Sequence, residues 1–388
     1  MADLIVTREF PPQDGGIAVV AYEMAAHWSK NKRPIQVLCW NYVRGKWPSQ
    51  FQDQDQTFSI NRMDQPSARI VQIWALTVQI FKIHQREKID RIWATSWNFS
   101  GVASCVFNFF TGVPYAVLTH GYEVSRPALS RTDIGLLKIV LKRAKRVFSV
   151  SHYTRDLVLK FIPKLQNVEF VPNGIDAEKF SPKVSGTLEF KKKFGLEGKK
   201  VLLTVARLFP RKGHDQVIDA LPAILARVPT AHYLIVGEGP EKENLRQKVQ
   251  KKNLQGSVTF AGFVQDRDLP VCYASCDIFI LPNRVIDDPK DPWVGDFEGF
   301  GVAFIEASAA GKPVIGGNSG GVADAVIDGV TGFLVSPTNP QEIAEKACLL
   351  LEDPELARKI GLQGRQRVEN ELDWPMVLQK YEDAFDDH

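Results

Sequence analysis

Short apolar runs alternate with helix-like stretches along the whole chain, and this alternation restricts its fold more than any other feature. The runs are rich in β-branched residues and apolar on both faces, so their sheet needs helices on both sides. In the first half of the chain the predicted strands are Leu4–Thr7, Gln36–Trp40, Arg91–Thr95, Tyr115–Thr119, Arg146–Val150 and Val168–Val171. The helix-like stretches between them cover residues 16–31, 68–88, 99–111, 132–143 and 151–161. Together they predict an α/β fold with a doubly wound parallel sheet.

The same alternation begins again after residue 199. The strands predicted there are Lys200–Ala206, His232–Val236, Val258–Phe260, Asp277–Leu281, Pro313–Gly316 and Phe333–Val335. Because Pro172-Asn173-Gly174 suits a turn between the two series, we expect two Rossmann-like domains, residues 1–173 and 174–374. A last helix, residues 375–388, is expected to pack back on the first domain. Ligands of such sheets bind outside the carboxyl ends of the strands, so two sheets facing each other would form one cleft.

The composition of the 388-residue chain is that of a folded water-soluble protein, with 44% hydrophobic and 24% charged residues. No run approaches the ~18 continuous apolar residues of a membrane span, and no charged leader precedes the first predicted strand. The cysteines are odd in number and lie in apolar contexts: Cys39, Cys105, Cys272, Cys276 and Cys348. We therefore expect structural thiols and a cytoplasmic location.

Charge is divided unevenly between the two halves. Residues 1–173 hold 22 Lys and Arg against 13 Asp and Glu, and the remainder holds 26 against 32. The helix-like segment Leu136–Arg146 concentrates lysines and arginines among apolar residues. Such a basic half favours an anionic partner, such as a phospholipid surface at the inner face of the membrane or a phosphorylated acceptor, and no nucleic acid is expected. Ordinary surface charge and an ordinary packed helix remain the alternative.

The segment from Glu298 to Glu306 carries the clearest chemistry in the sequence. A glycine-rich turn leads into a helix there, so free backbone N–H groups near Gly301 and Val302 would point at a bound ligand. A helix N-terminus of this kind suits a diphosphate. One turn into the helix, Glu306 could accept two hydrogen bonds from a ribose diol, and Glu298 could contact a sugar hydroxyl. The alternative is a surface helix whose acids face water.

Two glutamates separated by seven residues, with Gly-x-Gly between them, resemble the signature of family 4 retaining glycosyltransferases of the GT-B fold. Further matches follow in the family's order. The segment Arg207-Leu208-Phe209-Pro210-Arg211-Lys212-Gly213 follows the first strand of the second domain and resembles the Arg and Lys that hold the donor diphosphate. At a strand end, Arg207 and Lys212 can neutralise two phosphates and so stabilise a departing nucleoside diphosphate.

Several glycine-containing turns extend the resemblance. Val236-Gly237-Glu238-Gly239 and Phe260-Ala261-Gly262-Phe263 resemble the loops that border the nucleobase, and Ser319-Gly320-Gly321-Val322-Ala323-Asp324 resembles a Gly-Gly-x-x-Glu turn in which Asp324 replaces Glu. In the first domain Asp14-Gly15-Gly16-Ile17-Ala18 opens a helix, where Gly16 could touch the donor phosphate. Thr119-His120-Gly121-Tyr122-Glu123 resembles the motif whose histidine lies beside the donor sugar.

The resemblance implies one set of site residues for the whole chain. The residues expected to bind the donor are Gly16, Gly237, Glu238, Phe263, Phe300, Gly301, Val302 and Glu306. Those expected to take part in transfer are His120, Arg207, Lys212 and Glu298. Asp53 and Asp55 have the spacing of a metal-binding Asp-x-Asp, but they lie in a Gln-rich stretch and follow no predicted strand. We therefore expect neither a metal nor another cofactor.

The function implied is transfer of a hexose, with retention, from a nucleotide sugar to a lipid or glycan hydroxyl. The Asp- and Pro-rich segment Asn283–Glu298 resembles that of phosphatidylinositol mannosyltransferase-like members, which favours GDP-mannose as the donor. The resemblance also places the donor in the second domain and the acceptor in the first. A UDP-sugar-dependent transferase, a sugar-nucleotide epimerase of the same fold and a catalytically idle binding protein remain the alternatives.

Overall fold

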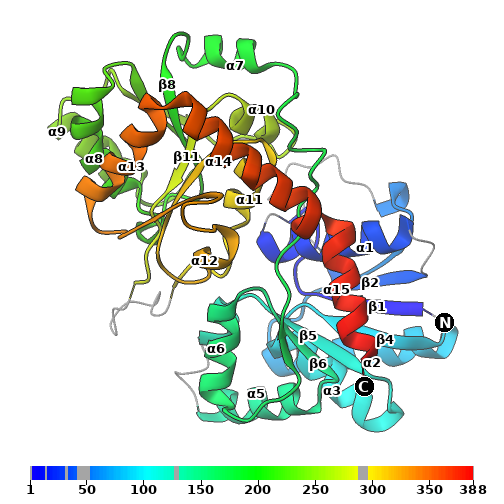
Figure 1. Cartoon of the computed structure of the whole chain (residues 1–388). Helices are drawn as coiled ribbons and strands as arrows, with labels where there is room; N and C mark the ends of the chain where they lie inside the picture. The colour runs from blue at the N-terminus through cyan, green and yellow to red at the C-terminus, as the bar shows by residue number, and fades with distance from the viewer. Residues whose placement is uncertain are drawn as a thin grey trace. The chain divides into compact units, whose positions relative to one another are not determined.

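The chain forms two compact α/β units, each built on its own parallel sheet (Figure 1). The computed structural model describes residues 2–13, 15–30, 34–41, 53–125, 131–286 and 296–387. One unit is Met1–Gly174 with Trp374–His388, and the other is Ile175–Asp373. These bounds lie within one residue of those expected from the sequence. The predicted class, two doubly wound parallel-sheet units, is confirmed.

The sheet of the first unit has seven strands in the order β3-β2-β1-β4-β5-β6-β7, all paired in parallel. Its strands are β1 (Ala2–Val6), β2 (Ile35–Trp40), β3 (Ser59–Met63), β4 (Ile89–Ala94), β5 (Tyr115–Thr119), β6 (Arg146–Ser149) and β7 (Val168–Phe170). Each of the six strands predicted for this half overlaps one of them. The order reverses between β1 and β4, which is the position where doubly wound sheets bind ligands.

Helices cover both faces of this sheet. They are α1 (Gly16–Lys30), α2 (Arg69–Arg86), α3 (Val102–Thr111), α4 (Tyr122–Ser125), α5 (Arg131–Arg143), α6 (His152–Phe161) and α15 (Trp374–Asp386), with short helical turns at Asp53–Asp55 and Trp97–Gly101. One buried cluster joins alternate strand residues to α2, α3, α5 and α6. The other joins the remaining strand residues to α1 and the C-terminal helix α15. There Phe385 and Tyr381 of α15 lie against Trp93 and Phe148, with ring centroids 4.8–6.2 Å apart.

The edge strand β3 is not among the predicted strands. Its sequence, Ser-Ile-Asn-Arg-Met, is too polar to read as a buried strand, and none of its residues is fully buried. Arg62 of β3 is held by Asp53, with N–O distances of 2.6 and 2.8 Å. The continuous apolar run that identifies the other strands is therefore absent from β3.

The second unit repeats the arrangement with six parallel strands in the order β10-β9-β8-β11-β12-β13. They are β8 (Lys200–Val205), β9 (Ala231–Val236), β10 (Val258–Gly262), β11 (Ile278–Leu281), β12 (Val314–Gly317) and β13 (Gly332–Val335). All six predicted strands of this half overlap one of them. The strand order reverses between β8 and β11, so their carboxyl ends form the expected binding position.

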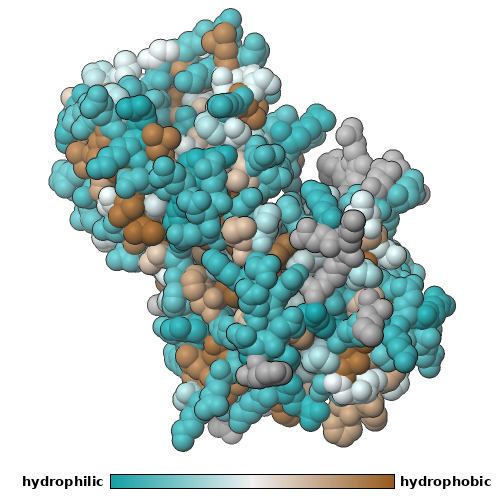
Figure 2. All heavy atoms as spheres, turned by 45° about the vertical axis from the view of Figure 1, so that its right-hand side comes forward, coloured by the Kyte–Doolittle hydropathy of each residue, from teal (hydrophilic) through white to brown (hydrophobic). Residues whose placement is uncertain are grey.

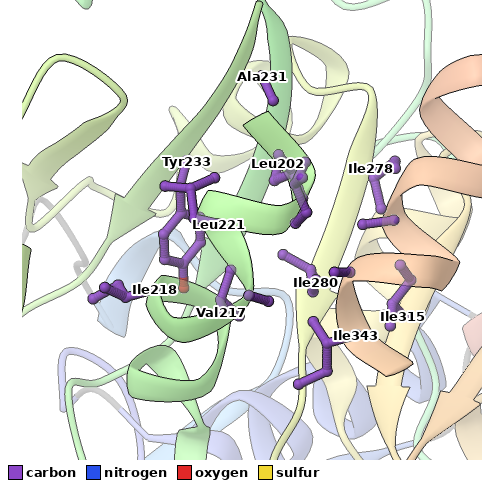
Figure 3. Packing of buried hydrophobic residues seen from close by; sticks show 14 of the residues in the cluster. Leu202, Val217, Ile218, Leu221, Ala231, Tyr233, Ile278, Ile280, Ile315 and Ile343 are labelled. Carbon is purple, nitrogen blue, oxygen red and sulfur yellow. The ribbon is translucent and has the colours of Figure 1, made fainter. Parts of the chain in front are cut away.

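The helices of this unit also pack on both faces. They are α7 (Thr187–Lys193), α8 (His214–Arg227), α9 (Lys242–Lys251), α10 (Leu269–Ala274), α11 (Val302–Ala309), α12 (Val322–Ala325), α13 (Pro340–Glu352) and α14 (Pro354–Arg367), with short turns at Pro210–Lys212 and Val368–Leu372. Ile278 and Ile280 of β11 point into a cluster with α8 and α13 (Figure 3). Phe279, between them, points to the opposite face, where its ring lies 5.6 Å from Tyr273 of α10 and 5.5 Å from Phe304 of α11.

Candidate active site

Most of the candidate residues follow the carboxyl ends of four neighbouring strands in the second unit. Lys212 lies after β8, Glu238 after β9, Phe263 after β10 and Glu298 after β11. The strands are parallel, so these loops emerge at one edge of the sheet. The change of strand order between β8 and β11 leaves the loops that carry Lys212 and Glu298 next to each other.

Glu298 forms a partly buried ion pair with the expected phosphate-binding lysine. The Lys212 ammonium donates to Oε2 of Glu298, and Nη1 of Arg211 donates to the same oxygen at 3.1 Å. The Arg211 Nε lies 2.9 Å from a carboxylate oxygen of Asp296. The side chains of Lys212 and Glu298 are 13% and 15% exposed, so water weakens this pair far less than it weakens a surface pair. The charged groups of Lys212, Glu298, Arg211 and Asp296 thus alternate in sign at the switch point, where the strand order reverses between β8 and β11.

This cluster sets the charge of Glu298. Burial by itself would raise the pKa of Glu298, but the charges of Lys212 and Arg211 outweigh it and hold that pKa below its ordinary value. Burial lowers the pKa of Lys212, and the charge of Glu298 opposes this effect. Glu298 is therefore a carboxylate at neutral pH, and it accepts hydrogen bonds without donating any.

Close backbone packing brings Lys212 to the loop after β11. Gly213 has φ 73° and caps α8, and a Cβ on it would collide with the carbonyl oxygen of Pro282. The backbone N–H of Arg284 donates to the carbonyl of Arg211 at 2.8 Å, which joins the two loops next to this contact. A glycine is therefore required beside Lys212 for a steric reason.

A second turn holds the backbone of Glu298. Gly321, after β12, donates its N–H to the Glu298 carbonyl at 2.8 Å. Gly320 has φ 60°, and a Cβ on it would come within 2.5 Å of the same carbonyl. The Gly-Gly turn therefore positions Glu298 through its backbone. Asp324, the residue that departs from the family pattern, is partly exposed, and its carbonyl accepts from Arg367 at 2.7 Å.

The helix α11 begins where the sequence predicts an anion site. Gly301 is its N-cap with φ 96°, and no side chain caps the first turn. A Cβ on Gly301 would come within 2.5 Å of Phe304, so the turn needs glycine. Val302 is partly exposed, whereas Phe300 is only 2% exposed. Phe300 could therefore meet a ligand only through its backbone.

Glu306 lies one turn into α11, as expected, and it has a partner that the sequence motif does not include. The buried phenol of Tyr273 donates to its Oε2. Burial raises the pKa of Glu306, while the Tyr273 hydrogen bond and the charge of Lys179 lower it. The net effect is a raised pKa, and this donor and the nearby cation are the two influences that favour the ionised form of Glu306.

The Gly237-x-Gly239 turn is explained by packing. A Cβ on Gly237 would collide with the Ala206 carbonyl, and one on Gly239 would lie 2.5 Å from that of Leu208. The Leu208 N–H donates to the Glu238 carbonyl at 3.0 Å. The two glycines therefore let the turn after β9 lie directly against the segment that follows β8, which is expected to hold phosphate.

Three of the expected site residues lie outside the Lys212–Glu298 ion pair. Arg207 is exposed, and its guanidinium lies 4.8 Å from the centroid of the Phe209 ring. Glu238 pairs with Lys242 at 2.7 Å. Phe263 is 62% exposed at the end of β10, which leaves its ring open to a planar ligand. Across the described ranges, no acidic side chain forms an ion pair with Arg207.

His120 and Gly16 belong to the first unit, at the carboxyl ends of its strands. His120 follows β5, its Nε2 lies 3.1 Å from the carbonyl oxygen of Thr95, and its backbone N–H donates to Glu123. Burial lowers the pKa of His120, although Glu123 opposes this, so the imidazole is neutral. A Cβ on Gly16 would meet nothing within 4 Å. No packing contact requires a glycine there, and the site remains open to a ligand.

Sequence reasoning missed several polar residues around the ion pair. Arg211 lies in the segment that resembles the diphosphate-binding motif, but no role was predicted for it. His214 and Asn283 are buried, and their polar side-chain atoms have no hydrogen-bond partner within the part of the chain that the structure describes. Burial and the charge of Lys212 lower the pKa of His214 to about 3. The position of Asn283 directly after a strand is a signal that could have identified it.

The remaining expectations concern metals, thiols and membranes. Among the described residues, no group of three or more His, Cys, Asp or Glu side chains is placed to hold a metal ion. The five cysteines are buried free thiols. No described helix is both long and apolar enough to span a bilayer. Most of the Asp- and Pro-rich segment on which the donor preference rests, residues 287–295, lies outside the described residues.

Comparison with known proteins assigns each of the two units to a glycosyltransferase family. A family model described as "Glycosyltransferase Family 4" matches residues 14–179, and one described as "Glycosyl transferases group 1" matches residues 187–367. The chain is 29% identical, over 98% of its length and 97% of the relative's, to a GDP-mannose-dependent alpha-(1-6)-phosphatidylinositol monomannoside mannosyltransferase of Mycobacterium tuberculosis. A protein of the same name from Mycolicibacterium smegmatis is 34% identical over 66% of this chain and 65% of its own.

A similar fold is found among solved structures. The crystal structure of Anabaena Alr3699/HepE in complex with UDP superposes with a TM-score of 0.81 at 22% identity, and the match covers 99% of each chain.

Proposed function

We propose that this chain, which belongs to the nucleotide-sugar-dependent glycosyltransferases with a family 4 and a group 1 domain, transfers mannose from GDP-mannose to a lipid or glycan hydroxyl, with retention. The observation that carries the proposal is the ion pair of Lys212 with Glu298 at the switch point of the second unit. The names of relatives at 29–34% identity support GDP-mannose. The UDP complex of a structural neighbour keeps a UDP-sugar as the alternative donor.

In the proposed reaction the donor diphosphate lies at the N-terminus of α11. Lys212, Arg207 and the free amides near Gly301 stabilise the charge that develops as the bond from the anomeric carbon to the phosphate oxygen breaks. The acceptor oxygen bonds to the same face of that carbon, and its proton passes to the leaving phosphate. No step of this mechanism uses a metal ion.

The remaining residues position the donor. Glu306 would accept from the ribose diol, and Glu298 from a hydroxyl of the hexose. Phe263 and the turn that carries Gly237 and Glu238 would border the base. That Gly16 and His120 of the first unit act on the same donor stays a prediction of the resemblance.

The partly buried ion pair gives donor binding a further consequence. Lys212 already has a carboxylate partner in the ligand-free protein, so an incoming phosphate competes with Glu298 for it. Once the phosphate holds Lys212, Oε2 of Glu298 keeps only Arg211 as a donor and gains capacity to accept from a sugar hydroxyl. Diphosphate binding would thereby prepare the sugar-binding group.

Thermal unfolding tests the choice of nucleotide. At a concentration 100 times the Kd, GDP should stabilise the chain by about 2.7 kcal/mol and raise its Tm by roughly 5 °C or more. UDP and ADP at the same concentration should give a much smaller shift. Stabilisation by UDP without stabilisation by GDP would overturn the choice of GDP-mannose and leave the transferase itself in place.

Product analysis distinguishes a transferase from an epimerase and from an idle binding protein. A transferase forms a glycosylated acceptor, an epimerase changes the donor sugar without an acceptor, and an idle binding protein leaves the donor intact. We therefore expect mannosylated product when GDP-mannose is supplied with candidate lipid and glycan acceptors. Conversion of the donor sugar with no acceptor present would favour the epimerase.

The proposal includes peripheral contact with the inner face of the membrane, and exposed apolar side chains on the first unit support it. Ile70 and Trp74 of α2 are 78% and 65% exposed, and Phe109 and Phe110 of α3 are 66% and 70% exposed. The Phe110 ring lies 6.3 Å from that of Phe81 on α2, so the two helices present adjoining surfaces. We call Ile70, Trp74, Phe109 and Phe110 the α2–α3 patch. Figure 2 shows hydrophobic side chains on the lower surface, where Figure 1 has α2, α3 and α5.

Lysines and arginines lie on α2, which carries part of this patch, and on α5. Helix α2 carries three Lys and Arg residues and no acid. On α5, the Arg143 guanidinium lies 5.3 Å from the centroid of the Phe109 ring. Lys138 and Lys142 of α5 line a cavity of about 750 Å³ together with Lys164. Exposed aromatic rings beside lysines and arginines are typical of surfaces that bind anionic lipid.

Vesicle sedimentation tests this contact. We expect the chain to bind vesicles of phosphatidylcholine with phosphatidylglycerol, and not phosphatidylcholine alone. The combined substitution Trp74→Ser, Phe109→Ser and Phe110→Ser should reduce binding roughly 10⁴-fold, because about 2 kcal/mol is lost for each large apolar side chain that no longer enters the interface. Leu362→Ser, at a 51% exposed position of the second unit, is the matched control. If the chain bound vesicles equally well with and without phosphatidylglycerol, the membrane contact would be removed from the proposal.

A further inference from the structure

Tyr273 is a fully buried phenol whose hydroxyl reaches a carboxylate of the candidate donor site. It lies on α10, outside the motifs that carry the family resemblance, and its side chain is 0% exposed. Its hydroxyl donates to Oε2 of Glu306 on α11. Its ring packs against Phe279 of β11 at 5.6 Å and edge-on against Phe180 at 5.8 Å. These contacts hold the hydroxyl in one place.

While Glu306 is ionised, its hydrogen bond with Tyr273 can run in only one direction. Burial and the charge of Glu306 raise the pKa of Tyr273 well above its ordinary value, so the phenol keeps its proton at every pH of interest. Tyr273 is therefore a permanent donor, and Glu306 must accept from it. A buried carboxylate without such a donor would take up a proton more readily, because burial disfavours its charged form.

The protonation state of Glu306 determines which hydrogen bonds its carboxyl group can make. A ribose diol offers two O–H donors, and an ionised carboxylate with one oxygen already fixed by Tyr273 presents the other at a defined angle. A protonated Glu306 loses acceptor capacity and can rotate. Its place one turn into α11, about 6 Å along the helix axis from Val302, separates it from the proposed diphosphate site.

We infer that Tyr273 is a positioning residue that orients Glu306 to accept from the ribose of the donor nucleotide and favours its ionised form. The inference rests on the proposed function, in which Glu306 binds ribose. The inference adds Tyr273, which lies 33 positions from Glu306 in the sequence, to the residues of the donor site. It assigns Tyr273 to ribose selectivity and not to the transfer step.

Isothermal titration with GDP, 2′-deoxy-GDP and 2′,3′-dideoxy-GDP tests the inference. Wild type should prefer GDP over the dideoxy nucleotide by roughly 10-fold or more, the effect of one or two hydrogen bonds to a charged group. Tyr273→Phe should reduce this preference to about 3-fold or less and leave the affinity for the dideoxy nucleotide unchanged. The affinity of the variant for GDP should also fall at a higher pH than in wild type as the solution is acidified, because its Glu306 takes up a proton sooner.

Tyr233→Phe is the matched control. Tyr233 is likewise 0% exposed in the second unit, and its hydroxyl lies 2.9 Å from that of Thr204, so the variant removes a buried phenol hydroxyl elsewhere. It should keep the wild-type preference for ribose. Glu306→Gln tests the proposed function separately. It should lose the preference for GDP over the dideoxy nucleotide whether or not Tyr273 positions residue 306.

The outcomes distinguish the inference from its premise. A wild-type preference in Tyr273→Phe, together with its loss in Glu306→Gln, would overturn the role of Tyr273 and leave Glu306 as the ribose ligand. Equal weakening of all three nucleotides in Tyr273→Phe would mean a structural role, and it would also overturn the inference. A preference that survives in Glu306→Gln would contradict the proposed role of Glu306 and the inference with it.

Discussion

Lys212→Ala should lower donor turnover by about 10²–10³-fold while the chain stays folded, the usual effect of removing one group that stabilises developing charge. The ammonium is 13% exposed and lies where the loops after β8 and β11 meet. Its charge acts there with little screening by water. Glu298 keeps Arg211 as a partner at 3.1 Å, so the variant leaves no isolated buried carboxylate. The measurement is the rate of nucleotide release from the donor selected by thermal unfolding.

Lys248→Ala provides the control for this variant. Lys248 is also a partly buried lysine of the second unit paired with a carboxylate, Asp219, but it lies on α9 and outside the candidate site. It should retain wild-type turnover. Wild-type turnover in Lys212→Ala would remove the lysine from the proposed mechanism, and thermal unfolding of both variants shows whether either change alters the fold.

Glu298→Ala should also lose about 10²–10³-fold in turnover, because the proposed hydrogen bond to the hexose disappears from the transition state. Its effect on nucleotide binding should have the opposite sign to that of Lys212→Ala. Removal of the carboxylate frees Lys212 and Arg211 for phosphate, so GDP should bind as tightly as to wild type or more tightly. Lys212→Ala should bind GDP more weakly.

Calorimetric Kd values for GDP, measured beside turnover, separate the two roles. Glu298→Gln, which keeps the shape of the side chain and loses its charge, should behave like Glu298→Ala in GDP binding. Glu352→Ala, at a surface pair with Arg227, is the control for loss of a carboxylate and should change neither quantity. If Glu298→Ala lost affinity for GDP, the ion pair would not compete with phosphate as we propose.

The two kinds of carboxylate in this site differ in their environment. Glu298 faces two cations, which hold its pKa below the ordinary value despite burial. Glu306 faces a neutral phenol and a more distant lysine, and its pKa is raised by burial. A group with a raised pKa loses its charge first as the pH falls. The acid limit of donor binding should therefore follow Glu306, with Glu298 ionised through the same range.

Much of the fold was predictable because its determinants are local along the chain. All twelve predicted strands overlap observed ones, since buried parallel strands carry a continuous apolar signal. The starts of two helices also carry a local signal, of a different kind. Asn339 and Asp353 cap α13 and α14 ahead of prolines at the first helical positions. The strand β3 was missed because its polar sequence carries no such signal.

The site was predictable where a motif holds its residues together in sequence. Glu298, Gly301 and Glu306 lie in one short segment that ends the loop after β11 and begins α11, so their closeness follows from the sequence. The partners of these residues did not follow from it. Arg211 and Lys212 are adjacent cations, and nothing local shows that both donate to one oxygen of Glu298. Tyr273 looks like one more core aromatic until its hydroxyl is seen at Glu306.

The two doubly wound units, and the glycine-containing turns at their strand ends, can be read from the amino-acid order, because periodicity and glycine placement act over a few residues. Only the folded chain shows which charges meet, which polar groups lose water and which backbone carbonyls approach a glycine. Those contacts join loops from different strands, as Gly213 meets Pro282 and Gly321 meets Glu298. The interactions in them depend on distance and burial in space, which separation along the chain does not encode.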